Sequence, residues 1–244
     1  MNKGYKTKIY KQYATLIQGT SSFFDEKLVQ RWGRAYDIFL KGWLPSNKNV
    51  AILEVGCGDG RLLYFFKARG YANIQGVDIS PQQVELAKQV IENVIEADAI
   101  KYLDSHPDSF DLIVGLDIIE HFKKDEVLNF LGACYKALRP KGRLILQTPN
   151  AESPWGMKVR YADFTHELIF DPPCLKKLLE LEGFIEIESR PTGPVVHGIL
   201  SLARFLIWEI IWFILAIWNL AETGSTGSSI YTRVFLISGI KESC

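Results

Sequence analysis

Glu54 and the three glycines that follow it have the residue types and the spacing of a ligand-binding turn. The glycines stand at positions 56, 58 and 60, and Glu54 stands two residues before the first of them. Glycine has no Cβ atom, so a ligand can approach the main chain there and a positive φ costs little. A carboxylate would repel a phosphate group. The pattern therefore favours a ligand with a positive group, such as an amine or a sulfonium.

Asp78 is the second carboxylate of the same pattern. A strand-like apolar stretch ends at Asp78, 22 positions beyond Gly56. An acid at this distance from a glycine turn can accept hydrogen bonds from the two hydroxyl groups of a ribose. A glycine turn without a ligand is the simpler alternative, but the acids and the glycines occur together in a strand–turn–helix–strand context. The residues therefore predict S-adenosylmethionine, which carries both a ribose and a sulfonium.

These side chains need elements that bring them to one edge of a sheet. Strand-like and helix-like patterns alternate over residues 50–148, which predicts an α/β fold with a parallel, doubly wound sheet. In such a sheet, ligands bind at the carboxyl ends of the strands. Four acids fall at those ends: Glu54, Asp78, Asp98 and Asp117. The predicted strands are 50–55, 73–78, 93–97, 110–115 and 142–148, and the predicted helices are 60–69, 81–91, 99–104 and 124–138.

The two ends of the chain add elements to this core. Apolar and aromatic residues at helical spacing predict two helical segments within residues 5–44, divided by residues 19–22. Helices before a nucleotide-binding strand can act as a lid. We therefore divide the chain into a helical lid, residues 1–45, and a cofactor-binding domain, residues 46–244. Within that domain, residues 172–182 predict a further helix, and residues 184–190 and 229–240 predict two further strands.

An apolar helical insertion at residues 198–221 separates those last two strands. Only Arg204 and Glu209 are charged between Ile199 and Leu220, and the length is close to the ~20 residues that span a bilayer. A single span would separate the last strand from its own sheet, so pairing within the sheet excludes it. Three alternatives stay open. The segment packs on its own domain, forms a homodimer interface, or makes peripheral contact with a membrane surface, where tryptophan is favoured.

The composition limits the partners and the compartment. Lys and Arg number 28, as do Asp and Glu, so the net charge is zero and gives no argument for nucleic acid. Residues 1–50 hold nine Lys or Arg against three acids, which fits a solvated helical face or an arm that meets an anionic substrate or membrane. The four cysteines form no CxxC pair. We therefore expect a reducing cytoplasm, with the inner face of the membrane as an alternative location.

Ordered motifs in the chain resemble those of class I S-adenosylmethionine-dependent methyltransferases. They are Glu54–Gly60, Gly76–Ser80, Ala97–Ala99 and Phe110–Ile113. Leu138–Arg143 is similar to the turn before the family's fifth strand, with Lys141 where glycine is more usual. Asp117–His121 resembles the ubiquinone-pathway O-methyltransferases. Residues 147–150 and 160–167 resemble bacterial methyltransferases of surface-polysaccharide or glycan synthesis.

This resemblance implies a Rossmann-like class I methyltransferase fold. The fold has a seven-stranded, mostly parallel sheet with helices on both faces, here with an N-terminal helical lid and an apolar insertion before the last strand. The resemblance also implies how the cofactor is held. The methionine part would contact Glu54, Gly56 and Gly58. The ribose hydroxyls would bind Asp78, the adenine would meet Ile79, Asp98 and Ala99, and the sulfonium would lie near Leu116 and Asp117.

Transfer of a methyl group to a hydroxyl needs a base, and histidine is the usual choice near neutral pH. His121 follows the fourth strand beside the predicted cofactor site, where a packing or helix-entry role is the alternative. His166 lies in a polar segment after the fifth strand, where substrate-facing insertions often sit. Both histidines are candidate catalytic residues. Arg160, Tyr161 and Asp163 in the same segment are candidate substrate contacts.

Asp117, Glu120 and His121 allow a second interpretation, as ligands of a divalent cation. The spacing i, i+3, i+4 places all three on one face of a helix, and two carboxylates with one imidazole suit a hard ion such as magnesium. The alternative is that Glu120 and His121 shape the cofactor pocket. We predict no metal.

The leading hypothesis for function is O-methylation of a glycan or of another small-molecule hydroxyl acceptor. The alternatives are a lipid or quinone O-methyltransferase, a small-molecule N-methyltransferase, and a cofactor-binding partner subunit without activity. The acceptor depends on residues 5–44 and 150–170, which contain no decodable chemical motif.

Overall fold

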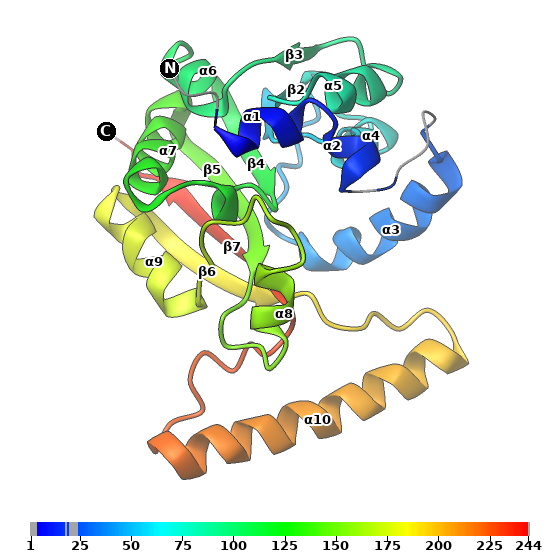
Figure 1. Cartoon of the computed structure of the whole chain (residues 1–244), viewed down its shortest axis with the longest axis vertical. Coiled ribbons are helices and arrows are strands. Elements are labelled where there is room, and N and C mark those ends of the chain that lie inside the picture. The colour runs from blue at the N-terminus through cyan, green and yellow to red at the C-terminus, as the bar shows by residue number, and fades with distance from the viewer. Residues whose placement is uncertain (1–3, 18, 20–23, 244) are drawn as a thin grey trace.

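A seven-stranded sheet forms the centre of the molecule, with the strand order β3-β2-β1-β4-β5-β7-β6 (Figure 1). The structure is a computed structural model and describes residues 4–17, 19 and 24–243. Strand β7 runs antiparallel to both of its neighbours, and the other strands are parallel to one another. The strands are β1 (Ile52–Val55), β2 (Ile74–Asp78), β3 (Val94–Glu96), β4 (Phe110–Leu116), β5 (Leu138–Pro149), β6 (Phe184–Pro191) and β7 (Val234–Lys241).

Apolar residues on both faces of the sheet explain its two layers of helices. Neighbouring side chains of a strand point to opposite faces, so Leu53 and Val55 of β1 enter one core cluster and Ile52 enters the other. The first cluster is completed by α6 (Ala99–Asp104), α7 (Lys124–Ala137) and α9 (Pro172–Leu181). The second is completed by α3 (Glu26–Phe39), α4 (Arg61–Ala68) and α5 (Pro81–Lys88).

The predicted Rossmann-like fold is confirmed, with differences at two strands. Strand β5 begins at Leu138 rather than at residue 142, because Leu138 pairs with Phe110 before residues 139–142 bulge away from β4. Lys141 in this bulge has a φ of +64°, a conformation that glycine adopts more easily. Strand β7 begins at Val234 rather than at residue 229, because residues 224–233 return the chain from the insertion to the sheet.

The described residues of the N-terminal region form three helices instead of the predicted two. They are α1 (Tyr5–Tyr10), α2 (Tyr13–Leu16) and α3. The predicted break at residues 19–22 lies outside the described residues except for Gly19. Asp25 begins α3 as its N-cap, with a side chain that accepts a hydrogen bond from the Leu28 N–H.

Two short helices that follow the strands are absent from the sequence prediction. The 3₁₀ helix η1 (Ile119–His121) follows β4, and α8 (Gly156–Arg160) follows β5. Asp117 leads into η1 with a φ of +54°. Both helices lie at the carboxyl edge of the sheet and carry residues of the candidate site.

The apolar insertion is a single helix, α10 (Ile199–Thr223), which ends at Gly224 in a left-handed conformation. It runs along one end of the molecule, joined to the body by two connecting segments (Figure 1). Among the described residues, α10 is the one helix long and apolar enough to cross a membrane by length and composition. Only Ser201 and Ala216 of α10 are buried.

Candidate active site

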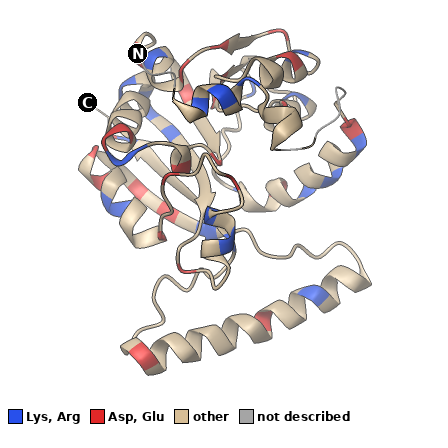
Figure 2. Ribbon diagram, viewed as in Figure 1, with Lys and Arg blue, Asp and Glu red and all other residues tan. Residues whose placement is uncertain are grey.

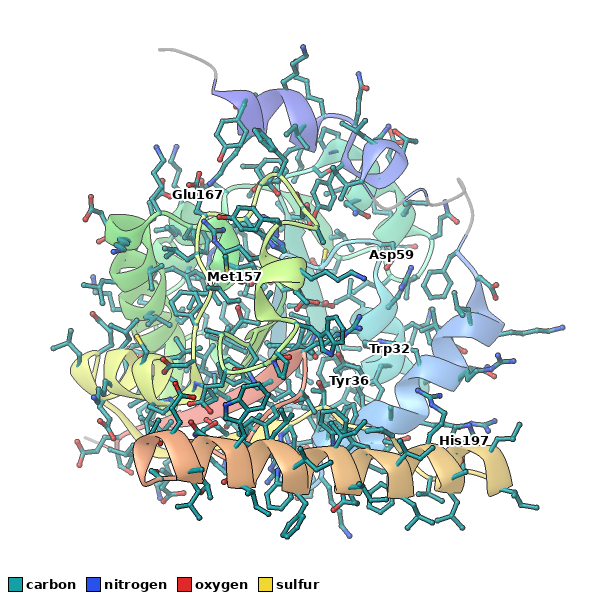
Figure 3. All side chains as sticks on the ribbon, turned by 60° about the horizontal axis from the view of Figure 1, so that its bottom comes forward. Trp32, Tyr36, Asp59, Met157, Glu167 and His197 are labelled. Atoms are coloured by element: carbon teal, nitrogen blue, oxygen red, sulfur yellow. The ribbon has the colours of Figure 1, made fainter. Side chains whose placement is uncertain are left out.

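A cleft of about 970 Å³ opens at the carboxyl edge of the sheet. All nine residues predicted to bind the cofactor line this cleft. It also receives side chains from the N-terminal helices, including Tyr10 and Tyr13. Figure 3 shows Trp32 and Tyr36 projecting from α3 toward the interior, and both residues line the same cleft. The cleft therefore joins the predicted cofactor residues, which we call its cofactor end, to aromatic side chains of the N-terminal region.

The glycine turn between β1 and α4 leaves the main chain open to the cleft. Gly56, Gly58 and Gly60 have φ values of +68°, +51° and +85°. A Cβ atom on Gly56 would lie 2.9 Å from Ile118 Cδ1, and one on Gly60 would lie 3.0 Å from Ala87 Cα. A Cβ atom on Gly58 would meet no described atom within 4 Å. Gly56 and Gly60 thus permit close packing, whereas Gly58 keeps the turn accessible.

Glu54 is a buried carboxylate with an unsatisfied oxygen. Its exposed fraction is 3%, and Oε2 has no hydrogen-bond partner among the described residues. Burial, together with the charges of Asp59 and Asp78, raises the pKa of Glu54 well above its usual value. A buried acceptor without a partner is costly. A cationic ligand in the cleft would supply both the charge and the missing donor.

Asp78 is held in place by the main chain at the end of β2. Its Oδ2 accepts a hydrogen bond from the Gly58 N–H at 2.9 Å, and its Oδ1 accepts one from the Ser80 N–H at 2.8 Å. Burial raises the pKa of Asp78, while these hydrogen bonds act in the opposite direction. Each carboxylate oxygen keeps a second lone pair, so the fixed group can still accept from ligand hydroxyls.

The far wall of the cofactor end combines an acid with apolar side chains. Asp98 caps α6 by accepting a hydrogen bond from the Lys101 N–H at 3.1 Å. Ala99 follows it, and Ile79, whose side chain is 47% exposed, lies on the same cleft. A flat apolar ring with an amino group would meet both kinds of contact at this wall.

Asp117 is joined to the N-terminal region through Gln147. Gln147 Nε2 lies 3.1 Å and 3.0 Å from the two carboxylate oxygens of Asp117, and Gln147 Oε1 accepts a hydrogen bond from the Tyr36 hydroxyl at 2.6 Å. Burial raises the pKa of Asp117 to about 6. The ring of Trp32 stacks on that of Tyr36, with centroids 3.9 Å apart. Asp117 therefore has a fixed orientation next to an aromatic wall.

His121 is oriented by a chain of hydrogen bonds that reaches Asp163. The Thr165 hydroxyl donates to Asp163 Oδ1 at 2.7 Å and lies 2.9 Å from His121 Nδ1. Since the hydroxyl has a single proton, we infer that His121 Nδ1 donates to it, which leaves Nε2 as the basic nitrogen. Burial and nearby His166 lower the pKa of His121 to about 4, and Asp163 acts in the opposite direction. The Tyr13 hydroxyl donates to Asp163 Oδ2.

His166 and Glu120 lie beside His121 and retain unused polar atoms. The two imidazole rings are 4.8 Å apart between centroids. His166 Nδ1 and Glu120 Oε1 are buried without a hydrogen-bond partner among the described residues. One ligand atom from each of Glu120, His121 and His166 lies within 4.8 Å of the others. The structure therefore groups His166, rather than Asp117, with Glu120 and His121 as possible cation ligands.

The three predicted substrate contacts differ in burial and in their hydrogen-bond partners. Arg160 donates a hydrogen bond to the His166 carbonyl at 2.7 Å, and Tyr161 is 73% exposed. Asp163 is buried and bound to Tyr13 and Thr165. None of these three is among the residues that line the described cleft, to which the same segment contributes Val159, Ala162 and His166.

Several residues of the site had no signal in the sequence. Tyr10, Tyr13 and Gln147 line the cleft, and Thr165 orients His121. Tyr13 meets Asp163 across 150 positions of sequence, so no local spacing could indicate the contact.

The glycine turn, the acids at the strand ends and the sheet order define a Rossmann-like methyltransferase fold. Residues 24–188 match the family described as methyltransferase domain. This match covers more than half of the chain, and the chain therefore belongs to that family.

Two curated relatives are named ubiquinone biosynthesis O-methyltransferase. The protein from Idiomarina loihiensis is 35% identical over 105 residues, which cover 41% of this chain and 42% of the relative. The protein from Bartonella tribocorum is 30% identical over 122 residues, which cover 48% of each. The chain thus spans less than half the length of the curated relatives it matches.

Solved structures share the fold over nearly the whole chain. A SAM-dependent methyltransferase from Archaeoglobus fulgidus has a TM-score of 0.66 and 23% identity, and the match covers 95% of this chain and 99% of that one. Phosphoethanolamine N-methyltransferase 2 from Haemonchus contortus, in complex with S-adenosyl-L-methionine, has a TM-score of 0.63 and 18% identity. That match covers 96% of this chain and 60% of that one. At these identities the likeness concerns the fold alone.

Proposed function

We propose that the protein binds S-adenosylmethionine in the cleft and transfers its methyl group to a hydroxyl of a small-molecule acceptor. Membership of the methyltransferase domain family supports the reaction class. The names of the curated relatives support a hydroxyl as the acceptor group. One observation carries the proposal: the cleft that holds all nine predicted cofactor residues also holds His121, a neutral and oriented base.

The residues of the cofactor end fit the charges of S-adenosylmethionine. The cofactor supplies an electrophilic methyl group on a sulfonium when it is bound. Glu54, with its unsatisfied Oε2, suits the ammonium group, and Asp78 suits the ribose hydroxyls. Asp98, Ala99 and Ile79 suit the adenine. The open main chain at Gly58 lets the ligand approach closely.

His121 is the proposed general base. Its low pKa keeps the imidazole neutral at pH 7, so Nε2 can accept the proton of an acceptor hydroxyl. Asp163 stabilises the imidazolium through Thr165, which resembles the role of a carboxylate that orients a catalytic histidine. His166 lies next to this base and is a second proposed catalytic residue. Positioning of the two reactants in one cleft supplies much of the remaining acceleration.

We place the acceptor against the aromatic side chains of the cleft, which suit a ring-shaped acceptor. These side chains are Tyr10, Tyr13, Trp32 and Tyr36. A glycan and a quinol both present a flat face and hydroxyl groups to such a wall. The names of the relatives favour the quinol, while the glycan and an amine acceptor remain predictions from the sequence. We propose that the reaction takes place in the cytoplasm.

Turnover tests this function directly. The full chain is incubated with S-adenosylmethionine and, separately, with hydroxylated quinols, monosaccharides and primary amines, and S-adenosylhomocysteine is measured. We expect turnover with a hydroxyl acceptor. His121→Asn should lower kcat by about 100-fold or more, because proton transfer by a positioned base contributes ~10²–10⁴. Cofactor binding without turnover on any acceptor would contradict the proposal and favour a non-catalytic partner subunit.

Asp78→Ala tests the cofactor end of the same proposal. Loss of a charged acceptor costs roughly 1.5–3 kcal/mol, which corresponds to about a 10- to 100-fold weaker affinity for S-adenosylmethionine. The affinity is measured by titration calorimetry. Asp104→Ala, at the end of α6, is the control and should leave the affinity unchanged. Unchanged affinity of the Asp78→Ala variant would contradict the assignment of this acid to the ribose.

A divalent cation at Glu120, His121 and His166 is the second candidate for the catalytic end. The unused atoms Glu120 Oε1 and His166 Nδ1 favour it. The two candidates predict different enzyme activity after dialysis against EDTA. A cation site predicts loss of activity and recovery with magnesium or manganese, whereas a histidine base predicts that EDTA has no effect. We expect no effect of EDTA.

A further inference from the structure

Helix α10 leaves the sheet at the edge that carries the cleft. Pro191, the last residue of β6, pairs with Phe235 of β7, so the chain leaves and re-enters the sheet at neighbouring points. Val234, the first residue of β7, lines the cleft. The two connections that carry α10 therefore leave the sheet beside the cleft.

Both ends of α10 return to one sheet, which keeps its flanking segments on one side of any bilayer. Residues 192–198 join the helix to β6 and residues 224–233 join it to β7, and these two strands pair with each other. If α10 crossed a bilayer once, one of the two non-helical connections would have to cross it again, and lipid-exposed irregular backbone does not occur in the hydrocarbon region. A single transmembrane crossing is thus excluded.

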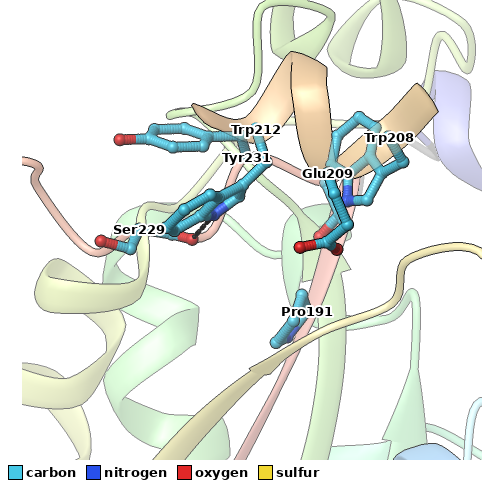
Figure 4. A pocket seen from close by; sticks show the side chains of 7 residues that line it. Pro191, Trp208, Glu209, Trp212, Ser229 and Tyr231 are labelled. Atoms are coloured by element: carbon cyan, nitrogen blue, oxygen red, sulfur yellow. Dashed lines mark hydrogen bonds between the residues drawn. The ribbon is translucent and has the colours of Figure 1, made fainter. Parts of the chain in front are cut away.

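Two tryptophans fix which face of α10 is turned toward the body. Trp212 Nε1 donates a hydrogen bond to the Ser229 carbonyl at 2.8 Å (Figure 4). Trp208 lines a cavity of about 160 Å³ with Pro191 and Tyr231, on the same side of the helix (Figure 4). Since these contacts set the rotation of α10 about its axis, the outward face is also defined.

The outward face of α10 is apolar over about half of its circumference, at 100° per residue. The three charged residues of the helix, Arg204, Glu209 and Glu222, fall just outside this arc, on its two borders. Figure 2 shows how few charges the helix carries. The side chains of the arc are 41–87% exposed: Ile199, Leu200, Leu202, Leu206, Ile207, Ile210, Ile211, Phe213, Ile214, Ile217, Trp218 and Leu220.

The width of this arc distinguishes a bilayer from a second copy of the chain. A partner helix covers a stripe of roughly 100°, which leaves the sides of a half-circumference bare. A lipid surface covers the entire arc at once. Charges on the two borders then stay at the level of the headgroups, and an exposed Trp218 suits the same level.

We propose that α10 lies in the plane of a lipid bilayer surface, with its outward arc in the boundary between headgroups and acyl chains. This attachment places the cleft beside the membrane, where an amphiphilic acceptor is available. The attachment itself does not depend on methyl transfer, so it can be tested without an assay of activity.

Vesicle flotation of the full chain tests the attachment. The vesicles contain phosphatidylethanolamine and phosphatidylglycerol at a ratio of about 3:1, an anionic bilayer. We expect the wild-type protein to float with the vesicles and to remain bound at high salt, because apolar burial is not screened. The variant Leu206→Gln, Ile210→Gln, Ile217→Gln removes three side chains from the centre of the arc and should lose at least about 90% of the floating fraction, a decrease of more than tenfold.

The matched control changes three exposed aliphatic side chains outside α10. This control is the triple variant Leu16→Gln, Ile38→Gln, Leu181→Gln. Its three positions are about as exposed as those changed in α10, and it should float like the wild type. Equal thermal unfolding of the two triple variants shows that both are folded. Absence of the wild-type protein from the vesicle fraction overturns the proposal. A dimer in light scattering that the α10 variant converts to a monomer, without flotation, identifies a second copy as the occupant and also overturns it.

Discussion

At the residue scale, the site is built from titratable groups whose pKa values burial shifts in opposite directions. The imidazole of His121 is kept neutral by its low pKa, while Asp117 and Glu120 nearby have raised pKa values. Burial is the largest cause in all three cases, because it disfavours the charged form of each group. Burial thus disfavours charge on all three groups in the empty cleft. The same holds for Glu54, whose ionised form a cationic ligand beside it would favour.

The pH dependence of stability should change when His121 is replaced. Between pH 6.5 and pH 4 the unfolded chain binds a proton at this residue that the folded chain excludes, so the contribution to stability falls as the pH falls. His121→Asn removes this effect, worth at most about 3 kcal/mol. We expect the variant to lose less stability than the wild type on acidification through this window, in urea unfolding at several pH values.

Asp117 supplies the control for this experiment. Its pKa is raised, to about 6, so its effect on the pH dependence of stability is opposite to that of His121. The folded chain keeps a proton that the unfolded chain releases above about pH 4, so this contribution is lost as the pH rises toward 6. Asp117→Asn should therefore lose more stability than the wild type on acidification. Parallel curves for all three proteins would contradict the assignment of these pKa shifts.

At the scale of elements, the turn from β1 to α4 contains one glycine that serves packing and another that serves ligand binding. Gly58 and Gly60 both have positive φ, but only Gly60 is packed against another helix, at Ala87 of α5. Gly58 faces open space. The two glycines therefore serve different purposes within one turn of the chain.

Alanine at these two glycines should separate the two purposes. Gly58→Ala is expected to cost about 1–2 kcal/mol of stability from the left-handed backbone alone, and to weaken S-adenosylmethionine binding. Gly60→Ala adds a clash with the main chain of α5 and should cost more stability. Thermal unfolding and calorimetry on both variants give the comparison. Equal stability of the two variants would show that the contact with α5 is unimportant.

The sequence predicted the elements with strong periodicity and missed those without it. Apolar runs or regularly spaced apolar residues occur in β1, β2, β4 and α7, because all four elements pack against the core. Helix α8 has only Gly156 buried and η1 has three residues, so neither produces a pattern. The cofactor residues could be predicted because they lie at the ends of strands, and the local sequence pattern indicates where those strands end. The contacts of His121 with Thr165 and of Asp163 with Tyr13 depend on tertiary packing alone.

At the scale of the whole molecule, the N-terminal helices close the cleft over the site. Lys6 forms an ion pair with Glu167 at 3.0 Å, and Tyr13 binds Asp163. The ring of Tyr10 lies 6.4 Å from that of His121 between centroids. Of the described residues in α1 and α2, only Ala14 is buried. Helices α1 and α2 thus contribute more to the site than to the core, which supports a lid role for these two helices, whereas α3 packs Tyr36 into the second core cluster.

Removal of residues 1–17 should therefore affect activity more than stability. Because little apolar surface is lost, the unfolding temperature should fall by no more than about 5 °C. We expect kcat/KM to fall about 100-fold, since Asp163 loses Tyr13 and water enters the cleft. Steady-state kinetics and thermal unfolding measure the two effects. Full activity of the shortened chain would contradict a lid.

The binding of S-adenosylmethionine to the wild type and to Glu54→Gln tests the central claim most directly. Calorimetry should show one site in the wild type and an affinity at least about tenfold weaker in the variant, because an amide cannot match the ammonium charge. The unliganded variant should also unfold at a higher temperature, since it lacks a buried carboxylate with an unsatisfied oxygen. Glu180→Gln on the exposed side of α9 is the control and should change neither quantity. Absence of binding to the wild type, or equal affinity of the Glu54→Gln variant, would contradict the account.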